Sequence, residues 1–354
     1  MTARILRDSP ADLALAVAAL RRGALVAIPT ETVYGLAGLA LQPEALARIF
    51  AAKDRPTFDP LIAHVAPSPQ GQRLQALADA QLVDLPQLTP LARQTAQRLA
   101  DAFWPGPLTL VLPRARAVPD LCTAGLDSVA VRMPAHPVAQ RILAALGQPL
   151  AAPSANRFGR VSPTTAAHVL AELGARIDWI VDGGPCAVGV ESTVVAVQPD
   201  GSCALLRPGG VTAEAIAAVS QQLVFRPEIS PLALPSPGLL ASHYAPSQPL
   251  QLLPVPIVAL DAATRARLFT PADVVLVARG DGAAERALLD PHQPPQLQLL
   301  SPDGSDVTAA QRLFACLRGM DGAPGALFAE PITAVTGLWP AIADRLGRAS
   351  APRT

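Results

Sequence analysis

Two residue types occur once each in this chain, and both occurrences fall inside short polar motifs. Lys53 is the single lysine among 28 basic residues, and Asn156 is the single asparagine. Lysine carries a compact, rotatable ammonium that arginine lacks, so its retention in an arginine-rich chain indicates a point charge against a phosphate or a developing oxyanion. Tyr34 and Tyr244, the two tyrosines, are rare in the same way. Chance is the alternative for each residue taken alone, because some residue type must be the rarest.

Hydroxyl and guanidinium groups lie at the ends of several predicted strands. Arg132 and Arg207 end two apolar runs, Ser192 opens a third, and the turn at residues 153–156 follows a short run at 150–152. Open α/β sheets bind ligands at the carboxyl ends of their strands, so these groups predict a pocket for carboxylates and phosphates. The sequence contains no phosphate loop, zinc motif, nucleophile elbow or catalytic dyad, so side chains would have to hold a phosphate.

Structural roles compete with these functional interpretations. Residues 53–55 precede Pro56 at the predicted end of a helix, where cations also stabilise the helix dipole. His64 lies in an apolar strand, and a lone histidine there is more often a buried hydrogen-bonded residue than a catalyst. Ser154 and Asn156 favour turns by bonding their own backbone. The residue types alone leave these alternatives open.

The elements that must position these groups alternate between helices and short strands. Ser9 and Pro10 predict the start of a first helix, and Gly23 predicts its end. Apolar periodicity predicts further helices at residues 43–52, 90–104, 137–146, 164–173 and 213–222. Apolar runs predict strands at residues 24–28, 61–65, 108–112, 129–133, 150–152, 177–181, 192–197 and 204–206. Because several strands follow one another directly, the expected fold class is α/β with a twisted, mixed, open sheet and flanking helices.

A proline-rich stretch at residues 226–249 interrupts this alternation and predicts a stiff linker. Beyond it, the pattern predicts strands at residues 257–260, 274–278, 297–300 and 326–328, and helices at 307–318 and 341–346. A chain of 354 residues also exceeds the usual size of one core. We therefore expect a larger domain at 1–225, the linker at 226–249 and a smaller α/β domain at 250–354.

Composition and charge disfavour some classes of function. The formal net charge is zero with a pI near 7, and no run of like charge occurs, so broad binding to nucleic acid or an anionic membrane is not expected. The four cysteines are widely spaced without a metal-ligand pattern, and fit either free thiols in a reducing compartment or small buried apolar residues. No secretory leader or membrane-spanning run is recognisable, so we expect a cytoplasmic protein.

Taken in order, several motifs resemble the YrdC family of threonylcarbamoyl-AMP synthases, in its long, two-domain form. The matching segments are PTETVYGLAG from Pro29, AKDRPTFDPLIAHV from Ala52, FWPGPLTLVL from Phe103, SVAVRMPAHP from Ser128, PLAAPSANRFGRVSPT from Pro149, VESTVV from Val190, LLRPGG from Leu205, SPGLLASHYAP from Ser236 and the tail ITAVTGLWPAIADRLGRAS from Ile332. The resemblance implies a YrdC-like catalytic domain followed by a Rossmann-like C-terminal domain.

The same resemblance implies an ATP-dependent nucleotidyltransferase reaction. It would join L-threonine, bicarbonate or carbon dioxide, and ATP into L-threonylcarbamoyladenylate and pyrophosphate. A partner transferase would then pass the threonylcarbamoyl group to an adenosine of tRNA. Mg²⁺ would enter with the nucleotide, without a metal site built by the protein. Stable direct binding of nucleic acid or membrane is not part of this expectation.

Position by position, the resemblance implies three overlapping sets of site residues. Those for L-threonine are Thr32, His64, Arg132, Ala152 and Ser192, with Arg132 as the carboxylate clamp. Those for ATP are Arg55, Asp59, Ser128, Ser154, Ser162, Arg207 and Tyr244. A polar tetrad would orient and neutralise the triphosphate and the activated carboxylate, and consists of Lys53, Arg55, Ser154 and Asn156. The segment 236–246 would fold over the mouth of the pocket as a lid.

Two positions depart from the family pattern. Asp54 stands where glycine or asparagine is usual, and Asp59 stands where asparagine is usual, so two carboxylates flank Lys53 and Arg55. An anion near a triphosphate repels it unless Mg²⁺ or an arginine intervenes. The carboxylate at position 59 therefore argues most directly against the ATP contact that the resemblance implies for Asp59.

Two other classes of protein compete with this interpretation. An RNA-binding or ribosome-maturation module could use an arginine-lined cleft, but the neutral charge and the lack of interleaved aromatic residues count against it. A carbamoyl-transfer domain of the kind found in hydrogenase maturation factors shares the fold, but this chain lacks the accompanying zinc-finger or acylphosphatase-like segments. Pyrophosphate release that requires both L-threonine and bicarbonate would separate the three.

Overall fold

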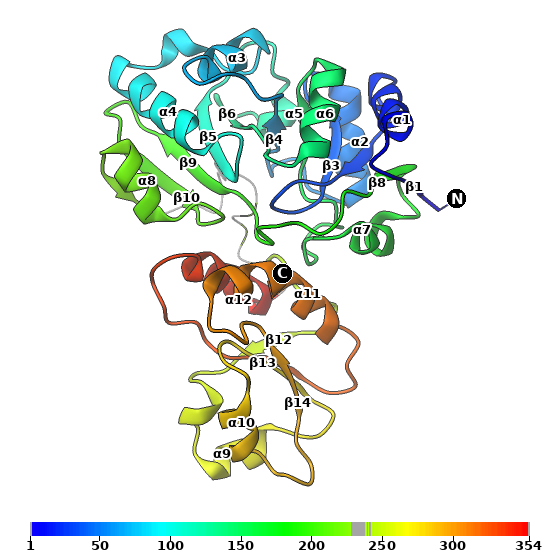
Figure 1. The fold of residues 1–354 in the computed structure, drawn as a ribbon, viewed down its shortest axis with the longest axis vertical. Coiled ribbons are helices and arrows are strands. Elements are labelled where there is room, and N and C mark those ends of the chain that lie inside the picture. Colours follow the sequence, from blue (N-terminus) through cyan, green and yellow to red (C-terminus); the bar gives the residue numbers. More distant parts are fainter. Residues whose placement is uncertain (1, 228–237, 239, 241, 353–354) are drawn as a thin grey trace. The chain divides into compact units, whose positions relative to one another are not determined.

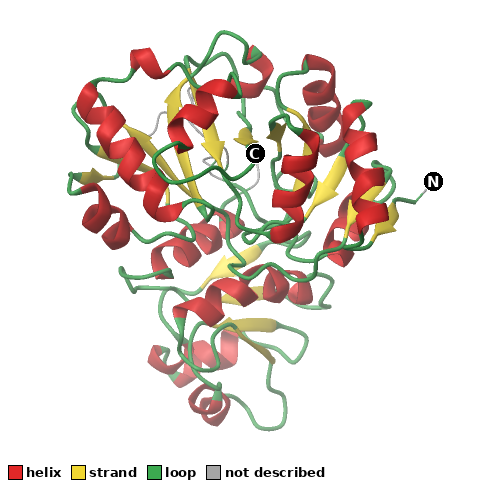
Figure 2. Cartoon of the chain, turned by 45° about the horizontal axis from the view of Figure 1, so that its top comes forward, coloured by secondary structure: helices red, strands yellow, loops and turns green. Residues whose placement is uncertain are grey.

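The computed structural model describes residues 2–227, 238, 240 and 242–352. The chain forms two compact units, Met1–Phe158 with Ser162–Leu239, and Gly159–Val161 with Leu240–Thr354. Figures 1 and 2 show helices and strands in both units. The predicted linker and lid at 226–249 lie partly outside the described residues, so their boundaries stay a prediction.

The first unit is built on one large mixed sheet. Its eleven described strands run in the order β1 (Arg4–Leu6), β8 (Trp179–Val181), β2 (Val26–Ile28), β3 (Gly35–Leu39), β7 (Leu150–Ala151), β4 (Ile62–His64), β6 (Ser128–Arg132), β5 (Leu108–Pro113), β9 (Thr193–Val197), β10 (Cys203–Arg207) and β11 (Val224–Phe225). The sheet contains both parallel and antiparallel pairs: β4 pairs with β6 in parallel, whereas β5 pairs with β6 in antiparallel orientation. The predicted mixed α/β fold is therefore confirmed.

Two helices of the first unit, those that start at Pro10 and Pro90, begin where local capping signals predict. The side chain of Ser9 accepts from the Asp12 amide, and that of Thr89 accepts from the Ala92 amide, which satisfies amides that have no partner within the helix. The helices are α1 (Pro10–Arg21), α2 (Pro43–Lys53), α3 (Arg73–Asp79), α4 (Pro90–Phe103), α5 (Asp120–Thr123), α6 (Pro137–Leu146), α7 (Ala166–Leu173) and α8 (Ala213–Ser220), with a short 3-10 helix at Leu85–Gln87.

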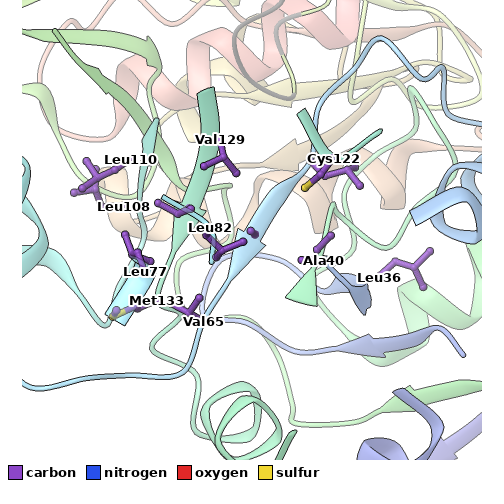
Figure 3. Packing of buried hydrophobic residues seen from close by; sticks show 14 of the residues in the cluster. Leu36, Ala40, Val65, Leu77, Leu82, Leu108, Leu110, Cys122, Val129 and Met133 are labelled. Atoms are coloured by element: carbon purple, nitrogen blue, oxygen red, sulfur yellow. The ribbon is translucent and has the colours of Figure 1, made fainter. Parts of the chain in front are cut away.

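Two apolar cores occupy the two faces of this sheet. The large core packs helices α2, α3 and α4 against the sheet, and Figure 3 shows part of it, including Leu77, Leu108 and Val129. The second core packs α1 and α6 against the opposite face through residues such as Leu20 and Ile142. Strand β2 divides its side chains accordingly, because alternate residues of a strand point to opposite faces.

The second unit is a smaller parallel α/β domain. Its sheet runs β12 (Leu250–Leu252), β15 (Leu327–Ala329), β13 (Val274–Val277) and β14 (Gln296–Leu299), and each neighbouring pair is parallel. The described helices are α9 (Ala262–Leu268), α10 (Ala283–Leu288), α11 (Asp306–Met320) and α12 (Trp339–Ser350). The predicted smaller α/β domain is confirmed, and no described helix in either unit has the length and hydropathy needed to span a membrane.

One predicted strand of the second unit is wrong. Ile257–Ala259 forms a 3-10 helix instead of the strand predicted at 257–260. Pro256 fixes the backbone before it, and the Ala259 amide donates to the Pro256 carbonyl at 2.9 Å. The Ile257 amide donates to the carboxylate of Glu330 at 2.8 Å, so a side chain takes the place of a strand partner.

Candidate active site

Several predicted site residues project from the sheet face opposite to the large core. On β4 and β6, Ala63 and Val131 belong to the large core, so His64 and Arg132 point to the other face. Thr109 on β5 does the same, and Ser192 directly precedes β9. The second core covers this face over β2, β3 and β7. Over β4, β6, β5, β9 and β10 the face carries a smaller apolar cluster, formed by Ile62, Val111, Ala130, Val194, Ala204 and Leu206. Polar groups on or directly before four strands therefore share one side of the sheet.

Arg132, at the end of β6, is the centre of the predicted L-threonine group. Its Nη1 donates to the hydroxyl of Thr32 at 2.9 Å, its Nε to the carbonyl of Gly106 at 3.1 Å, and its Nη2 to the carboxylate of Glu31 at 2.5 Å. All three side chains, those of Arg132, Thr32 and Glu31, are buried. Burial raises the pKa of Glu31, but the charge and hydrogen bond of Arg132 outweigh it, so the pKa lies below its ordinary value.

His64 lies on β4 beside this arginine, and Ala152 follows β7, the neighbour of β4 on its other side. His64 is the register partner of Arg132, and its Nδ1 lies 3.1 Å from the Ile62 carbonyl, which also accepts from the Ala152 amide at 3.1 Å. Burial, and then the charge of Arg132, lower the pKa of His64 to about 3. The imidazole is therefore neutral at physiological pH, and places an uncharged polar ring beside the guanidinium of Arg132.

Ser192 links the predicted threonine group to the predicted ATP group. Its hydroxyl lies 2.8 Å from that of Thr109 and accepts from Nη2 of Arg207 at 3.2 Å. Arg207 also donates from Nε and Nη2 to the Ser192 carbonyl, at 3.2 and 3.0 Å. Next to this pair, the hydroxyl of Ser162 donates to the buried carboxylate of Glu191 at 2.5 Å.

Lys53 ends α2 and reaches the turn that follows β7. Its Nζ donates to the backbone carbonyls of Ser154 and Asn156, both at 2.5 Å, and the residue is only 1 % exposed. The Phe158 amide donates back to the Lys53 carbonyl at 2.8 Å. Burial, followed by the nearby charge of Arg55, lowers the pKa of Lys53 well below its ordinary value. Lys53 thus fixes the turn that carries Ser154 and Asn156 of the predicted tetrad.

Each of the two unusual carboxylates is paired with an arginine. Asp54 lies in the left-handed region at the end of α2, and its exposed carboxylate accepts from Nη1 of Arg176 at 2.6 Å. The buried Asp59 carboxylate lies 2.9 Å from Nη2 of Arg55. This approach lacks hydrogen-bond geometry, and neither oxygen of Asp59 accepts a hydrogen bond from a described residue. Burial raises the pKa of Asp59 even though Arg55 and Lys53 oppose it.

Two residues of the predicted ATP set stand apart from these networks. Ser128 begins β6, opposite Pro113 of β5, whereas Arg132 ends that strand. Tyr244 belongs to the second unit, where its ring packs on Phe314 at a centroid distance of 5.6 Å and the guanidinium of Arg345 lies 5.4 Å from its centroid. Contact between ATP and either residue stays a prediction.

Sequence reasoning did not single out three polar residues of the site: Glu31, Thr109 and Glu191. Glu31 and Glu191 lie inside matched motifs, and both are buried. A buried carboxylate needs a hydrogen-bonding or charged partner. The presence of each glutamate beside buried strand residues could therefore have indicated a functional or structural pair. The partners themselves, Arg132 and Ser162, lie 101 and 29 residues away along the chain.

The fold and this arrangement define a known class of protein, and the chain belongs to it. Residues 18–209 match the model of the Sua5/YciO/YrdC family, described as "Telomere recombination". Residues 211–351 match a second family model, described as "Threonylcarbamoyl-AMP synthase, C-terminal domain". Together the two matches cover both structural units and confirm the resemblance drawn from the motifs.

Particular relatives carry the name threonylcarbamoyl-AMP synthase. The chain is 44 % identical to the one from Pyrococcus abyssi over 236 residues, which are 66 % of this chain and 65 % of the relative. It is 44 % identical to the one from Bacillus subtilis over 247 residues, which are 68 % of this chain and 66 % of the relative. These alignments thus span just under two thirds of the relatives.

A solved structure matches over almost the whole chain. The crystal structure of P. abyssi Sua5 complexed with L-threonine superimposes with a TM-score of 0.82 at 36 % identity, and the match covers 99 % of this chain and 98 % of that one. The two-unit architecture is therefore shared with that protein.

Proposed function

We propose that the protein is an L-threonylcarbamoyladenylate synthase, a nucleotidyltransferase that uses L-threonine, bicarbonate or carbon dioxide, and ATP. The observation that carries the proposal is the buried hydrogen bond from Arg132 to Thr32 at 2.9 Å. It joins two motifs 100 residues apart into one polar group that suits an amino-acid carboxylate. The L-threonine complex of P. abyssi Sua5, similar over nearly its full length, supports the choice of substrate.

The proposed reaction has two bond-forming steps. The neutral amine of L-threonine attacks carbon dioxide, and loss of a proton leaves a carbamate. A carbamate oxygen then attacks the α-phosphorus of ATP in line, and pyrophosphate leaves with the electron pair of the broken P–O bond. Holding three reactants together supplies a large part of the acceleration, because each encounter becomes intramolecular.

In the L-threonine group, Arg132 would bind the carboxylate as a clamp, with Thr32 beside it. The neutral His64 would accept or donate one hydrogen bond without adding charge, which keeps the pocket selective for an anion at Arg132. Ala152 would contact the substrate through its small side chain and backbone. The hydroxyl of Ser192 would connect the amino acid to the nucleotide, since it already bonds Arg207.

In the ATP group, Arg55 and Arg207 would supply positive charge to the phosphates, with Ser154, Ser162, Ser128, Asp59 and Tyr244 as further contacts. Lys53 would act by holding the carbonyls of Ser154 and Asn156, so that the tetrad presents its polar groups in one arrangement. Mg²⁺ would be carried by triphosphate oxygens, which together with water are its usual ligands in enzymes that use nucleotides.

The wider role follows from the product. An activated carbamoyl-adenylate hydrolyses in water, so a partner transferase would consume it by moving the threonylcarbamoyl group to an adenosine of tRNA. A cytoplasmic site of action fits that partner. The alternative of an RNA-binding module gains no support from the site, because its arginines are buried and paired with Glu31, Asp59 and Ser192.

Pyrophosphate release tests the proposal. The purified protein with ATP and Mg²⁺ should release pyrophosphate only when L-threonine and bicarbonate are both present. Release that continues unchanged without L-threonine would contradict the proposed function.

A further inference from the structure

Glu31 is a buried carboxylate that the proposed function does not use. It lies between Thr30 and Thr32 and is 7 % exposed. One carboxylate oxygen accepts from Nη2 of Arg132 at 2.5 Å, and the other accepts from the Ala135 amide at 3.0 Å. Its own carbonyl accepts from the Val188 amide at 2.7 Å. Glu31 therefore ties its turn to Arg132 and to two loops distant in sequence.

These contacts determine the plane of the Arg132 guanidinium. The group has five N–H donors in a rigid, planar fork. The Gly106 carbonyl, the Thr32 hydroxyl and the Glu31 carboxylate engage Nε, Nη1 and Nη2 respectively, so every nitrogen has a fixed partner. Of these partners only Glu31 carries charge, and its second carboxylate oxygen is anchored by the Ala135 amide.

The charge of Glu31 also makes the burial of Arg132 tolerable. An isolated guanidinium with little exposure loses most of its hydration, and a hydrogen-bonded carboxylate compensates for that loss. The side chains of the pair are 4 % and 10 % exposed. Without this partner, the free energy of the protein would be lower with the Arg132 side chain turned toward water or toward other acceptors.

We propose that Glu31 is a positioning residue for substrate: it holds Arg132 in the orientation that receives the carboxylate of L-threonine. This inference rests on the proposed function, and deepens it by assigning the carboxylate specificity to an Arg132–Glu31 unit. Thr32 completes the unit on the Nη1 side. Glu31 acts through Arg132 and does not contact the reacting atoms.

Two substitutions separate position from charge. Glu31→Gln keeps the length of the side chain but removes its charge and one acceptor, so one of the contacts to Arg132 and Ala135 is lost. Glu31→Asp keeps the charge but shortens the reach, so the carboxylate cannot span both partners. If Glu31 positions Arg132, both variants should bind L-threonine more weakly than wild type. If Glu31 only screens the charge of Arg132, Glu31→Gln should bind L-threonine more tightly. Asp8→Asn is the matched control, since it removes a carboxylate from the exposed pair with Arg141.

Full-length wild-type protein and variants should be compared with L-threonine and with L-threoninamide, which lacks the carboxylate. We expect Glu31→Gln to raise KM for L-threonine at least about tenfold, to leave KM for ATP within about twofold, and to reduce the preference for L-threonine over the amide. Glu31→Asp should also raise KM for L-threonine and reduce the preference over the amide. Asp8→Asn should match wild type in both quantities. An unchanged preference, or equal increases in both KM values, would overturn the positioning role.

Calorimetric titration with L-threonine, without ATP, keeps this test separate from the proposed function. Wild-type protein that binds L-threonine but releases no pyrophosphate would contradict the proposed reaction, while the affinities of the variants would still decide the role of Glu31. Thermal unfolding identifies a variant that does not fold. If Glu31→Gln does not fold, Glu31→Asp decides the outcome.

Discussion

Nζ of Lys53 lies 2.5 Å from the carbonyl oxygen of Asn156, so the single lysine and the single asparagine of the chain are hydrogen-bonded to each other across 103 residues. The same ammonium also donates to the Ser154 carbonyl. A compact cation with rotatable donors can serve two converging carbonyls in a buried site. A planar guanidinium on a longer side chain cannot do so without displacing the turn.

Lys53→Arg should therefore reduce activity although it preserves charge. We expect kcat/KM to fall at least about tenfold, or roughly 1.4 kcal/mol of transition-state stabilisation. Steady-state kinetics of pyrophosphate release would measure it. Arg141→Lys, the reverse exchange at an exposed ion pair, is the control and should have no effect. A fully active Lys53→Arg protein would show that the lone lysine is an accident of composition.

Thr32→Val should weaken L-threonine binding with little change in volume. The hydroxyl of Thr32 accepts from Arg132 and lies 2.9 Å from that of Thr30, so the methyl group of valine leaves buried polar atoms without this partner. We expect KM for L-threonine to rise about five- to tenfold, consistent with ~1 kcal/mol for one buried hydrogen bond. Thr95→Val, at a buried threonine of α4, should leave this KM unchanged. Equal effects of the two variants would indicate only a general loss of stability.

Asp59→Asn should change the pH dependence of stability. Burial raises the pKa of Asp59 in the folded protein above its ordinary value of 3.8. The folded chain then retains a proton that the unfolded chain has lost, so this carboxyl lowers the free energy of unfolding as pH rises from that value toward neutrality. Asparagine does not titrate, so the variant lacks this decrease in the free energy of unfolding. Denaturant unfolding should show the variant gaining stability relative to wild type over this range, and a difference independent of pH would refute the assignment.

Tyr244→Phe tests the predicted ATP contact. Phenylalanine keeps the ring contacts to Phe314 and Arg345, and thermal unfolding measures whether the second unit stays folded. If Tyr244 contacts ATP, KM for ATP should rise severalfold while KM for L-threonine stays constant. An unchanged KM for ATP would remove Tyr244 from the nucleotide site.

Local signals predicted many of the elements, and non-local pairing explains those that were missed. Caps such as Ser9 and Thr89 act within one turn, so the helices at Pro10 and Pro90 could be located from sequence. Strand β3 was not foreseen, because Gly35–Leu39 contains two glycines and an alanine and depends on its pairing with β2 and β7. Helices α9 and α10 are only seven and six residues long, which is too short for a clear periodic signal.

The candidate site shows the same limit. Motifs indicated Arg132 and Thr32, since each carries a chemical group at the edge of an apolar run. They could not indicate that Glu31 holds Arg132, or that Lys53 faces two carbonyls, because both relations join segments about a hundred residues apart. The position of Tyr34 is also informative: its hydroxyl donates to the Gly184 carbonyl at 2.7 Å, a structural contact in the first unit.

The most direct test of the central claim is mass spectrometry of the product formed from ¹³C-bicarbonate, L-threonine and ATP. We expect an adenylate that contains threonine and carries one ¹³C atom, formed together with pyrophosphate. If an adenylate of threonine forms without the labelled carbon, or if no adenylate forms while ATP is consumed, the assignment of this site to carbamate activation is contradicted.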